Sequence, residues 1–116
     1  ALLQHLDWEL LAAHPKPFIG YSDITSLALG LLLRTGMPAF FGPMVTSDFA
    51  RELSSEARET LWRLVCRAEP AGELRDSRTG SAVTLVPGKA SGPLVGGTLS
   101  LVVPTLGTPW EVPTEG

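Results

Sequence analysis

Near the start of the chain, serine, aspartate and histidine side chains supply the residue types of a serine hydrolase triad. Ser22 and Asp23 are adjacent, and the two histidines of the sequence are His5 and His14. In a triad the serine attacks a carbonyl carbon, the histidine takes the hydroxyl proton and the acid orients the imidazole. This interpretation requires a histidine within hydrogen-bond reach of the serine, which sequence spacing does not establish. A simpler role for Ser22 or Asp23 is to cap the helix that follows.

Two glycine-containing segments in the second half of the chain are also candidates for chemistry. Gly88-Lys89-Ala90-Ser91 is similar to the end of a phosphate-binding loop, but Val83 stands where the first glycine is required and no Ser or Thr follows Lys89. That segment therefore predicts a turn. Gly96-Gly97 precedes a predicted helix, and either binds an anion or carbonyl group or lets a helix pack closely on a strand. The residues alone leave both interpretations open.

The elements that must position these residues begin with a strand–helix–strand unit. A first helix is predicted over residues 2–13, and Pro15 ends it because proline lacks a backbone N–H. Short strands are predicted at 18–21 and 39–42, with a helix at 24–33 between them. Strands joined through a helical crossover lie parallel in one sheet. The fold class predicted is therefore α/β.

The helix at 24–33 is apolar on all of its faces. Leucines stand at positions 27, 29, 31, 32 and 33, which point in most directions around a helix axis. A helix without a polar face must be covered on every side, and so must a pair of parallel strands. The first 43 residues are too few to provide this cover. We therefore expect it to come from outside this chain or from a second copy.

Less regular elements follow. Ser54 or Ser55 is expected to cap a third helix, in which Cys66 is expected to be a small core or half-buried thiol. A boundary is expected around 70–78, where Pro, Gly and charged residues gather. The sequence then predicts a strand at 82–86 and a helix at about 99–106, and Pro104 would remove a hydrogen bond inside that helix.

Composition excludes several classes of protein. Hydrophobic residues make up 44% of the 116 and charged residues 18%, which excludes a disordered tail. Nine basic and twelve acidic residues without a basic block predict no nucleic-acid partner. No apolar run approaches the roughly 20 residues that span a bilayer, so no membrane partner is expected. One cysteine excludes a disulfide scaffold, and two histidines without neighbouring ligands predict no metal site.

Three phrases of the sequence occur in the order and with the gaps of one known peptidase family. The first contains Gly20-Tyr21-Ser22-Asp23, the second joins 34–36 to 41–43, and the third runs from 92 to 101 and on to 106–110. Together they resemble the LD-carboxypeptidases and their microcin-immunity relatives among the serine peptidases. The resemblance covers nearly the whole chain.

The resemblance implies a cytoplasmic hydrolase that removes the terminal D-alanine from murein tetrapeptides during peptidoglycan recycling. It implies a nucleophile domain with a parallel sheet, a smaller β-rich α+β domain, and a Ser-Glu-His triad between them. No cofactor is implied. The partner implied is a small muropeptide, and a homodimer is the assembly that the family suggests.

Mapped onto this family, the chain contains no catalytic residue. The nucleophilic serine is expected upstream of Ala1 and the histidine beyond Gly116. The family's glutamate belongs where this sequence has Ser91, whose hydroxyl is shorter and uncharged, and Thr98 replaces a usual asparagine. On the substrate side, the residues expected to be retained are Tyr21, Ser22, Asp23, Gly96 and Gly97.

The expected organisation is the end of a parallel nucleophile domain at 1–46, a helical linker at 47–78 and the start of the second domain at 79–116. The first hypothesis is a piece of a serine carboxypeptidase that is inactive as this chain alone. The alternative is a degenerate homologue that binds a muropeptide or a protein without cleaving it. A third hypothesis, a non-enzymatic α/β module, is disfavoured because three phrases match in order.

Overall fold

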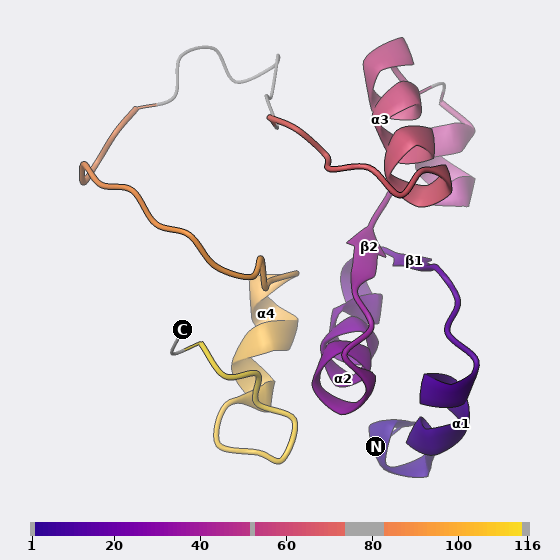
Figure 1. Ribbon diagram of the computed structural model, residues 1–116, viewed down its shortest axis with the longest axis vertical. Helices are drawn as coiled ribbons and strands as arrows, with labels where there is room; N and C mark the ends of the chain where they lie inside the picture. The colour runs from indigo at the N-terminus through magenta and orange to yellow at the C-terminus, as the bar shows by residue number, and fades with distance from the viewer. Residues whose placement is uncertain (1, 52, 74–82, 115–116) are drawn as a thin grey trace.

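The computed structural model describes residues 2–51, 53–73 and 83–114. It contains a parallel two-stranded sheet of β1 (Phe18–Gly20) and β2 (Ala39–Phe41), joined through α2 (Thr25–Thr35) (Figure 1). The register pairs Phe18 with Ala39 and Gly20 with Phe41. The α/β class and the parallel strand–helix–strand unit are therefore confirmed. A short 3-10 helix, η2 (Ser22–Ile24), connects β1 to α2.

The first predicted helix is in fact two shorter pieces. The chain forms a 3-10 helix, η1 (Leu2–His5), and then α1 (Trp8–Ala13). Asp7 separates them because its Oδ1 accepts a hydrogen bond from the Leu10 N–H at 2.9 Å, which begins a new helix there. The prediction of one continuous helix was wrong because this cap competes with the apolar periodicity.

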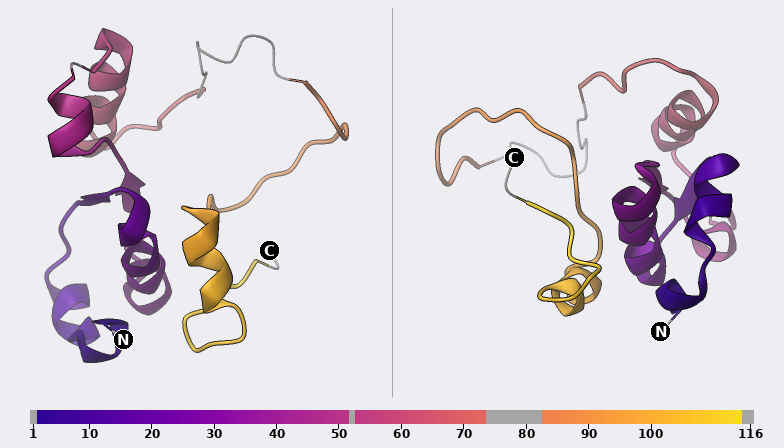
Figure 2. Two further views of the ribbon diagram at one scale, coloured as in Figure 1. Left: turned by 180° about the vertical axis from the view of Figure 1, so that it is seen from behind. Right: turned by 60° about the horizontal axis from the view of Figure 1, so that its bottom comes forward.

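Part of the surface of α2 is covered by other elements of the chain itself. Leu29 and Leu31 are 4% and 3% exposed, and they form the core of the described residues. The helix contacts α1, both strands and α4 (Leu99–Val102), a helix about 70 residues further along the chain (Figure 2). Gly36 ends α2 in the left-handed conformation with φ of 71°. The expectation that all cover lies outside the chain therefore needs correction.

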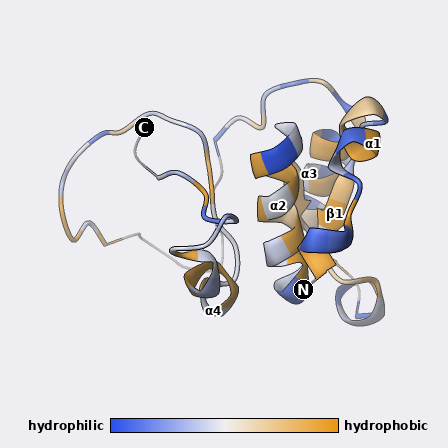
Figure 3. Cartoon of the chain, turned by 90° about the horizontal axis from the view of Figure 1, so that it is seen from below, coloured by the Kyte–Doolittle hydropathy of each residue, from blue (hydrophilic) through white to orange (hydrophobic). Residues whose placement is uncertain are grey.

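Much apolar surface nevertheless remains exposed to solvent. The accessible surface is 9494 Å², whereas a compact monomer of 12.3 kDa exposes about 6100 Å². Exposed apolar side chains include Ile19 and Phe41 on the sheet and Val45 and Phe49 in the π-helix η3 (Val45–Phe49). Figure 3 shows apolar residues along α2 and β1. The described residues thus have one small core, and several of their apolar surfaces pack against no other described part of the chain.

The third helix, α3 (Ser55–Cys66), forms as predicted. Ser54 is its N-cap, and its Oγ accepts a hydrogen bond from the Ala57 N–H at 3.2 Å. We expect Ser54→Ala to lower the free energy of unfolding of this helix by about 1 kcal/mol, because an N–H loses its acceptor. Ser55→Ala is the matched control, since Ser55 is the first helical residue. Equal loss of helicity on heating, measured for both variants by circular dichroism, would contradict this assignment.

The last part of the chain departs from prediction in two places. Residues 83–86 form no strand, and Ala82 lies outside the described residues. The predicted final helix is shorter: α4 ends at Val102 and continues as a 3-10 helix, η4 (Val103–Thr105). Pro104 explains this change, since it cannot donate the hydrogen bond that an α-helix requires. Among the described residues, a search of the helices finds no candidate for a membrane span.

Candidate functional site

Two aromatic rings mark the edge of the sheet where both strands end. Tyr21 follows β1 and Phe41 is the last residue of β2, so parallel pairing brings them to the same edge. Their ring centroids lie 5.3 Å apart at an interplanar angle of 52°, and both side chains are about half exposed. Open α/β sheets bind ligands at this edge. The predicted substrate-side residue Tyr21 therefore lies where a ligand would be expected.

Ser22 is held in an unusual backbone conformation at this edge. It is the one non-glycine residue with a positive φ, 53°, in the described part of the chain. Its hydroxyl donates a hydrogen bond to Asp23 Oδ1 at 3.2 Å. A left-handed serine costs free energy, and such residues gather at functional sites. The strain is consistent with a binding role for Ser22 and Asp23.

The predicted capping role of these two residues is wrong. Neither η2 nor α2 has a side-chain hydrogen bond at its N-cap, which is Tyr21 in the first case and Ile24 in the second. The reason is that the 3-10 turn places Ser22 and Asp23 inside the first turn rather than before it. Their polar atoms bind each other instead.

The histidines do not complete a triad. His5 ends η1, and His14 is the C-cap of α1, where its N–H donates to the Leu10 carbonyl. Within the described ranges, neither imidazole forms a hydrogen bond with Ser22 or Asp23. The same ranges contain no group of three or more His, Cys, Asp and Glu side chains that could hold a metal. The triad interpretation drawn from residue types therefore has no geometric support.

Gly97 lies against the beginning of α2. The N–H of the next residue, Thr98, donates a hydrogen bond to Thr25 Oγ1 at 3.0 Å. A Cβ on Gly97 would lie 2.8 Å from the same oxygen and closer still to Thr25 Cγ2, whereas a Cβ on Gly96 would meet nothing within 4 Å. Close packing therefore explains Gly97, while Gly96 faces open space. Ser91, six residues before Gly97, is exposed.

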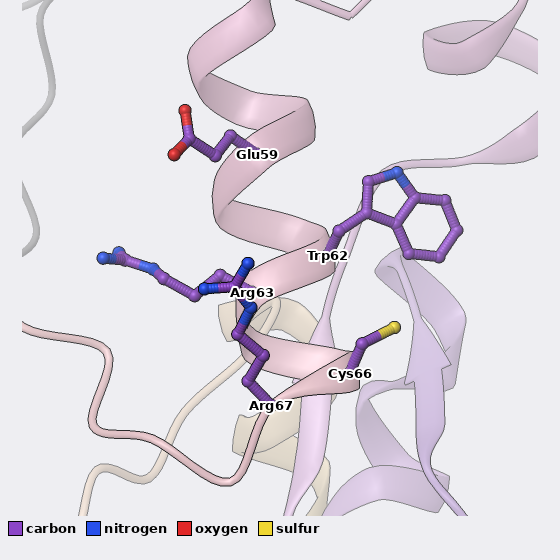
Figure 4. A pocket seen from close by; sticks show the side chains of 5 residues that line it. All are labelled: Glu59, Trp62, Arg63, Cys66 and Arg67. Carbon is purple, nitrogen blue, oxygen red and sulfur yellow. The ribbon is translucent and has the colours of Figure 1, made fainter.

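A shallow hollow on α3 was not predicted. It has a volume of about 270 Å³ and is lined by Glu59, Trp62, Arg63, Cys66 and Arg67 (Figure 4). Arg63 Nη2 donates to the Ala71 carbonyl at 2.8 Å, so the segment after the helix folds back on it. Cys66 is exposed, which corrects the expectation of a core thiol. The hollow shares no residue with the edge of the sheet at which Tyr21, Ser22, Asp23 and Phe41 lie.

Comparison with known proteins identifies similar sequences and structures. Residues 1–42 match the family model described as the LD-carboxypeptidase N-terminal domain. The chain is 40% identical over 112 residues, 96% of its length, to a probable murein peptide carboxypeptidase of Bacillus subtilis. It is 37% identical over 111 residues to the murein tetrapeptide carboxypeptidase of Pseudomonas aeruginosa, covering 92% of this chain. It covers 34% and 36% of these relatives, so it spans about a third of their length.

The fold is also shared with a solved structure. The microcin C7 self-immunity protein MccF, in its apo state, superimposes with a TM-score of 0.68 and 27% sequence identity. The match covers 95% of this chain and 40% of that one. The similarity therefore extends beyond residues 1–42 to the segment that contains Ser91 and Gly97.

Proposed function

We propose that this chain, whose first 42 residues belong to the LD-carboxypeptidase family, forms part of the substrate site of a serine carboxypeptidase that acts on murein peptides. The family resemblance indicated by the three sequence phrases is confirmed. The observation that supports the activity is that nearly the whole of this chain matches about a third of a probable murein peptide carboxypeptidase and of a murein tetrapeptide carboxypeptidase. We further propose that the activity is cytoplasmic and serves peptidoglycan recycling.

In this proposal the strand-end edge receives the peptide and the chain alone does not cleave it. Tyr21, Ser22 and Asp23 would line one side of the site, and the segment that contains Ser91 and Gly97 would line the other. The bond from the Thr98 N–H to Thr25 Oγ1 supports this arrangement, because it ties the end of that segment to the residue after Ser22, Asp23 and Ile24. The nucleophilic serine and the histidine would lie in the segments of the longer family members that this chain does not match. A serine hydroxyl at position 91 cannot stabilise an imidazolium as a carboxylate does.

Ser91 also favours a second candidate function, in which the protein binds a muropeptide without hydrolysing it. Both candidate functions predict that the peptide binds at the same residues. They differ in whether the peptide is hydrolysed when the missing serine and histidine are supplied by the rest of a related protein. Under both, the segments 1–46 and 79–116 would belong to different domains, with 47–78 as the linker.

Binding is tested by titrating the isotopically labelled chain with a murein tetrapeptide and following its amide resonances. We expect shifts at Tyr21, Ser22, Asp23 and Gly96, and none at residues of α3. The tripeptide without the terminal D-alanine is the control and should give smaller shifts. An unchanged spectrum would reject the site. Release of D-alanine by the chain alone, above a buffer blank, would overturn the assignment of Ser91.

A further inference from the structure

Thr25 is the most deeply buried side chain in the described structure. It is 1% exposed and is the first residue of α2, directly after the 3-10 turn that contains Ser22 and Asp23. The sequence analysis assigned it no role. A buried hydroxyl is stabilising only when it has a hydrogen-bond partner, so the identity of that partner shows what the residue does.

The partner of Thr25 comes from the far end of the sequence. Its Oγ1 accepts a hydrogen bond from the Thr98 N–H at 3.0 Å, across 73 positions. The other buried threonine, Thr105, donates its hydroxyl to the Val102 carbonyl three residues away, which is a local bond. Thr25 therefore joins two distant segments, whereas Thr105 stabilises the adjoining end of α4.

The segment that Thr25 fixes has little else to fix it. Every residue from 83 to 97 is exposed, so side-chain packing does not determine where this segment lies. Beyond Thr98, α4 packs on α2, and the next polar anchor in the described residues is at Pro109 and Trp110. Arg34 Nη2 donates to the Pro109 carbonyl at 3.2 Å, and the guanidinium lies 4.7 Å from the centre of the Trp110 ring. The Thr25 contact is the one nearer to Ser91.

Gly97 fits this contact from the other side. Its φ is 156°, and a side chain there would collide with Thr25. The absence of a Cβ lets the backbone come close enough for the Thr98 N–H to reach the hydroxyl. Thr25, Gly97 and Thr98 thus form one junction between the strand-end turn and the segment containing Ser91.

We propose that Thr25 is a positioning residue that holds Gly97 and Thr98, at the end of the segment containing Ser91, next to the turn that contains Ser22 and Asp23. The proposal rests on the proposed function, because it concerns the geometry of that same site. Thr25 itself contacts no substrate. Its hydroxyl sets the distance between the two sides of the site, which lie in segments that the family resemblance assigns to different domains.

The test measures amide hydrogen exchange at Thr98 in the full chain. We expect Gly97→Ala to speed exchange at this amide by about tenfold, since it loses one hydrogen bond, while the Gly42 N–H in the sheet keeps its rate. Gly96→Ala is the matched control and should change neither rate, because its Cβ meets nothing within 4 Å. Equal effects of the two alanines would overturn the proposal.

Substitution of Thr25 gives a second, independent measurement. Thr25→Val should also speed exchange at Thr98, and Thr25→Ser, which keeps the acceptor oxygen, should restore slow exchange. Thr105→Val removes a buried threonine hydroxyl without touching the junction and should leave Thr98 unchanged. Failure of serine to rescue, or an equal effect of Thr105→Val, would show that Thr25 is only a core residue.

Measuring both the exchange rates and peptide binding shows whether a failure lies in this proposal or in the proposed function. If the tetrapeptide shifts no resonance but the exchange results hold, the junction exists without the substrate site. If the tetrapeptide binds, Thr25→Val should abolish the shift at Gly96 and preserve those at Ser22 and Asp23. Retention of the Gly96 shift in Thr25→Val would show that the junction does not position the site.

Discussion

Ser91→Glu is expected to raise D-alanine release by about 10²- to 10⁴-fold in a chimera in which this chain replaces the matched third of the Bacillus subtilis relative. That relative supplies the segments in which the family's serine and histidine are expected. A carboxylate at position 91 would orient the imidazole and stabilise its charged form, which a hydroxyl cannot do. Release of D-alanine from a murein tetrapeptide, followed by mass spectrometry, provides the rate.

Ser100→Glu is the matched control for this chimera. Ser100 is an exposed serine in the first turn of α4, so it accepts a negative charge without loss of stability. It should leave the rate unchanged. A rate for Ser91→Glu no higher than that of the unsubstituted chimera would mean that the catalytic acid lies elsewhere. High activity before any substitution would mean that another acid already replaces it.

Leu31→Ala is expected to unfold most of the isolated chain. Leu31 is 3% exposed in a core with few other buried side chains, and loss of a buried leucine costs about 2–5 kcal/mol. That range is comparable with the whole stability of a small domain. Alanine favours helix as strongly as leucine does, so the loss would come from packing. Urea denaturation followed by circular dichroism at 222 nm measures it.

Leu10→Ala is the control for this prediction. Leu10 lies in α1 and is 56% exposed, so its truncation should change the free energy of unfolding by less than about 0.5 kcal/mol. Similar urea midpoints for the two variants would show that α2 is not the core of the folded chain.

Local signals predicted the parallel strand–helix–strand unit correctly. Pro15 excludes a helix where α1 ends, Gly36 ends α2, and the residues between them have the composition of strand and crossover helix. These signals act over a few residues, so they can be read from the sequence. The hydrogen bond that the Leu10 N–H donates to the Asp7 side chain is also local, and it was missed because the apolar spacing continues through it.

Long-range contacts account for most of what the sequence could not show. Residues 83–86 have the β-branched composition of a strand, but a strand forms only where a partner accepts its hydrogen bonds. Strand order alone predicted that Tyr21 follows a strand at the carboxyl edge of the sheet, where the structure has it, and its role toward a substrate stays a prediction. The contact of Thr25 with Thr98 was not predictable, because nothing in either segment encodes a neighbour 73 residues away.

Attachment of the C-terminal segment at both ends of α2 affects how the length of the intervening sequence can change. Thr25 and Arg34, the two attachment points, belong to one rigid helix, and α3 ends at Cys66, well before Thr98. The entropy of closing a flexible loop grows only with the logarithm of its length, so doubling it costs about 0.6 kcal/mol. Insertions between Ala71 and Ser91 should therefore cost the fold little stability. Evolution can therefore change the length of this stretch of sequence while both attachments to α2 stay in place.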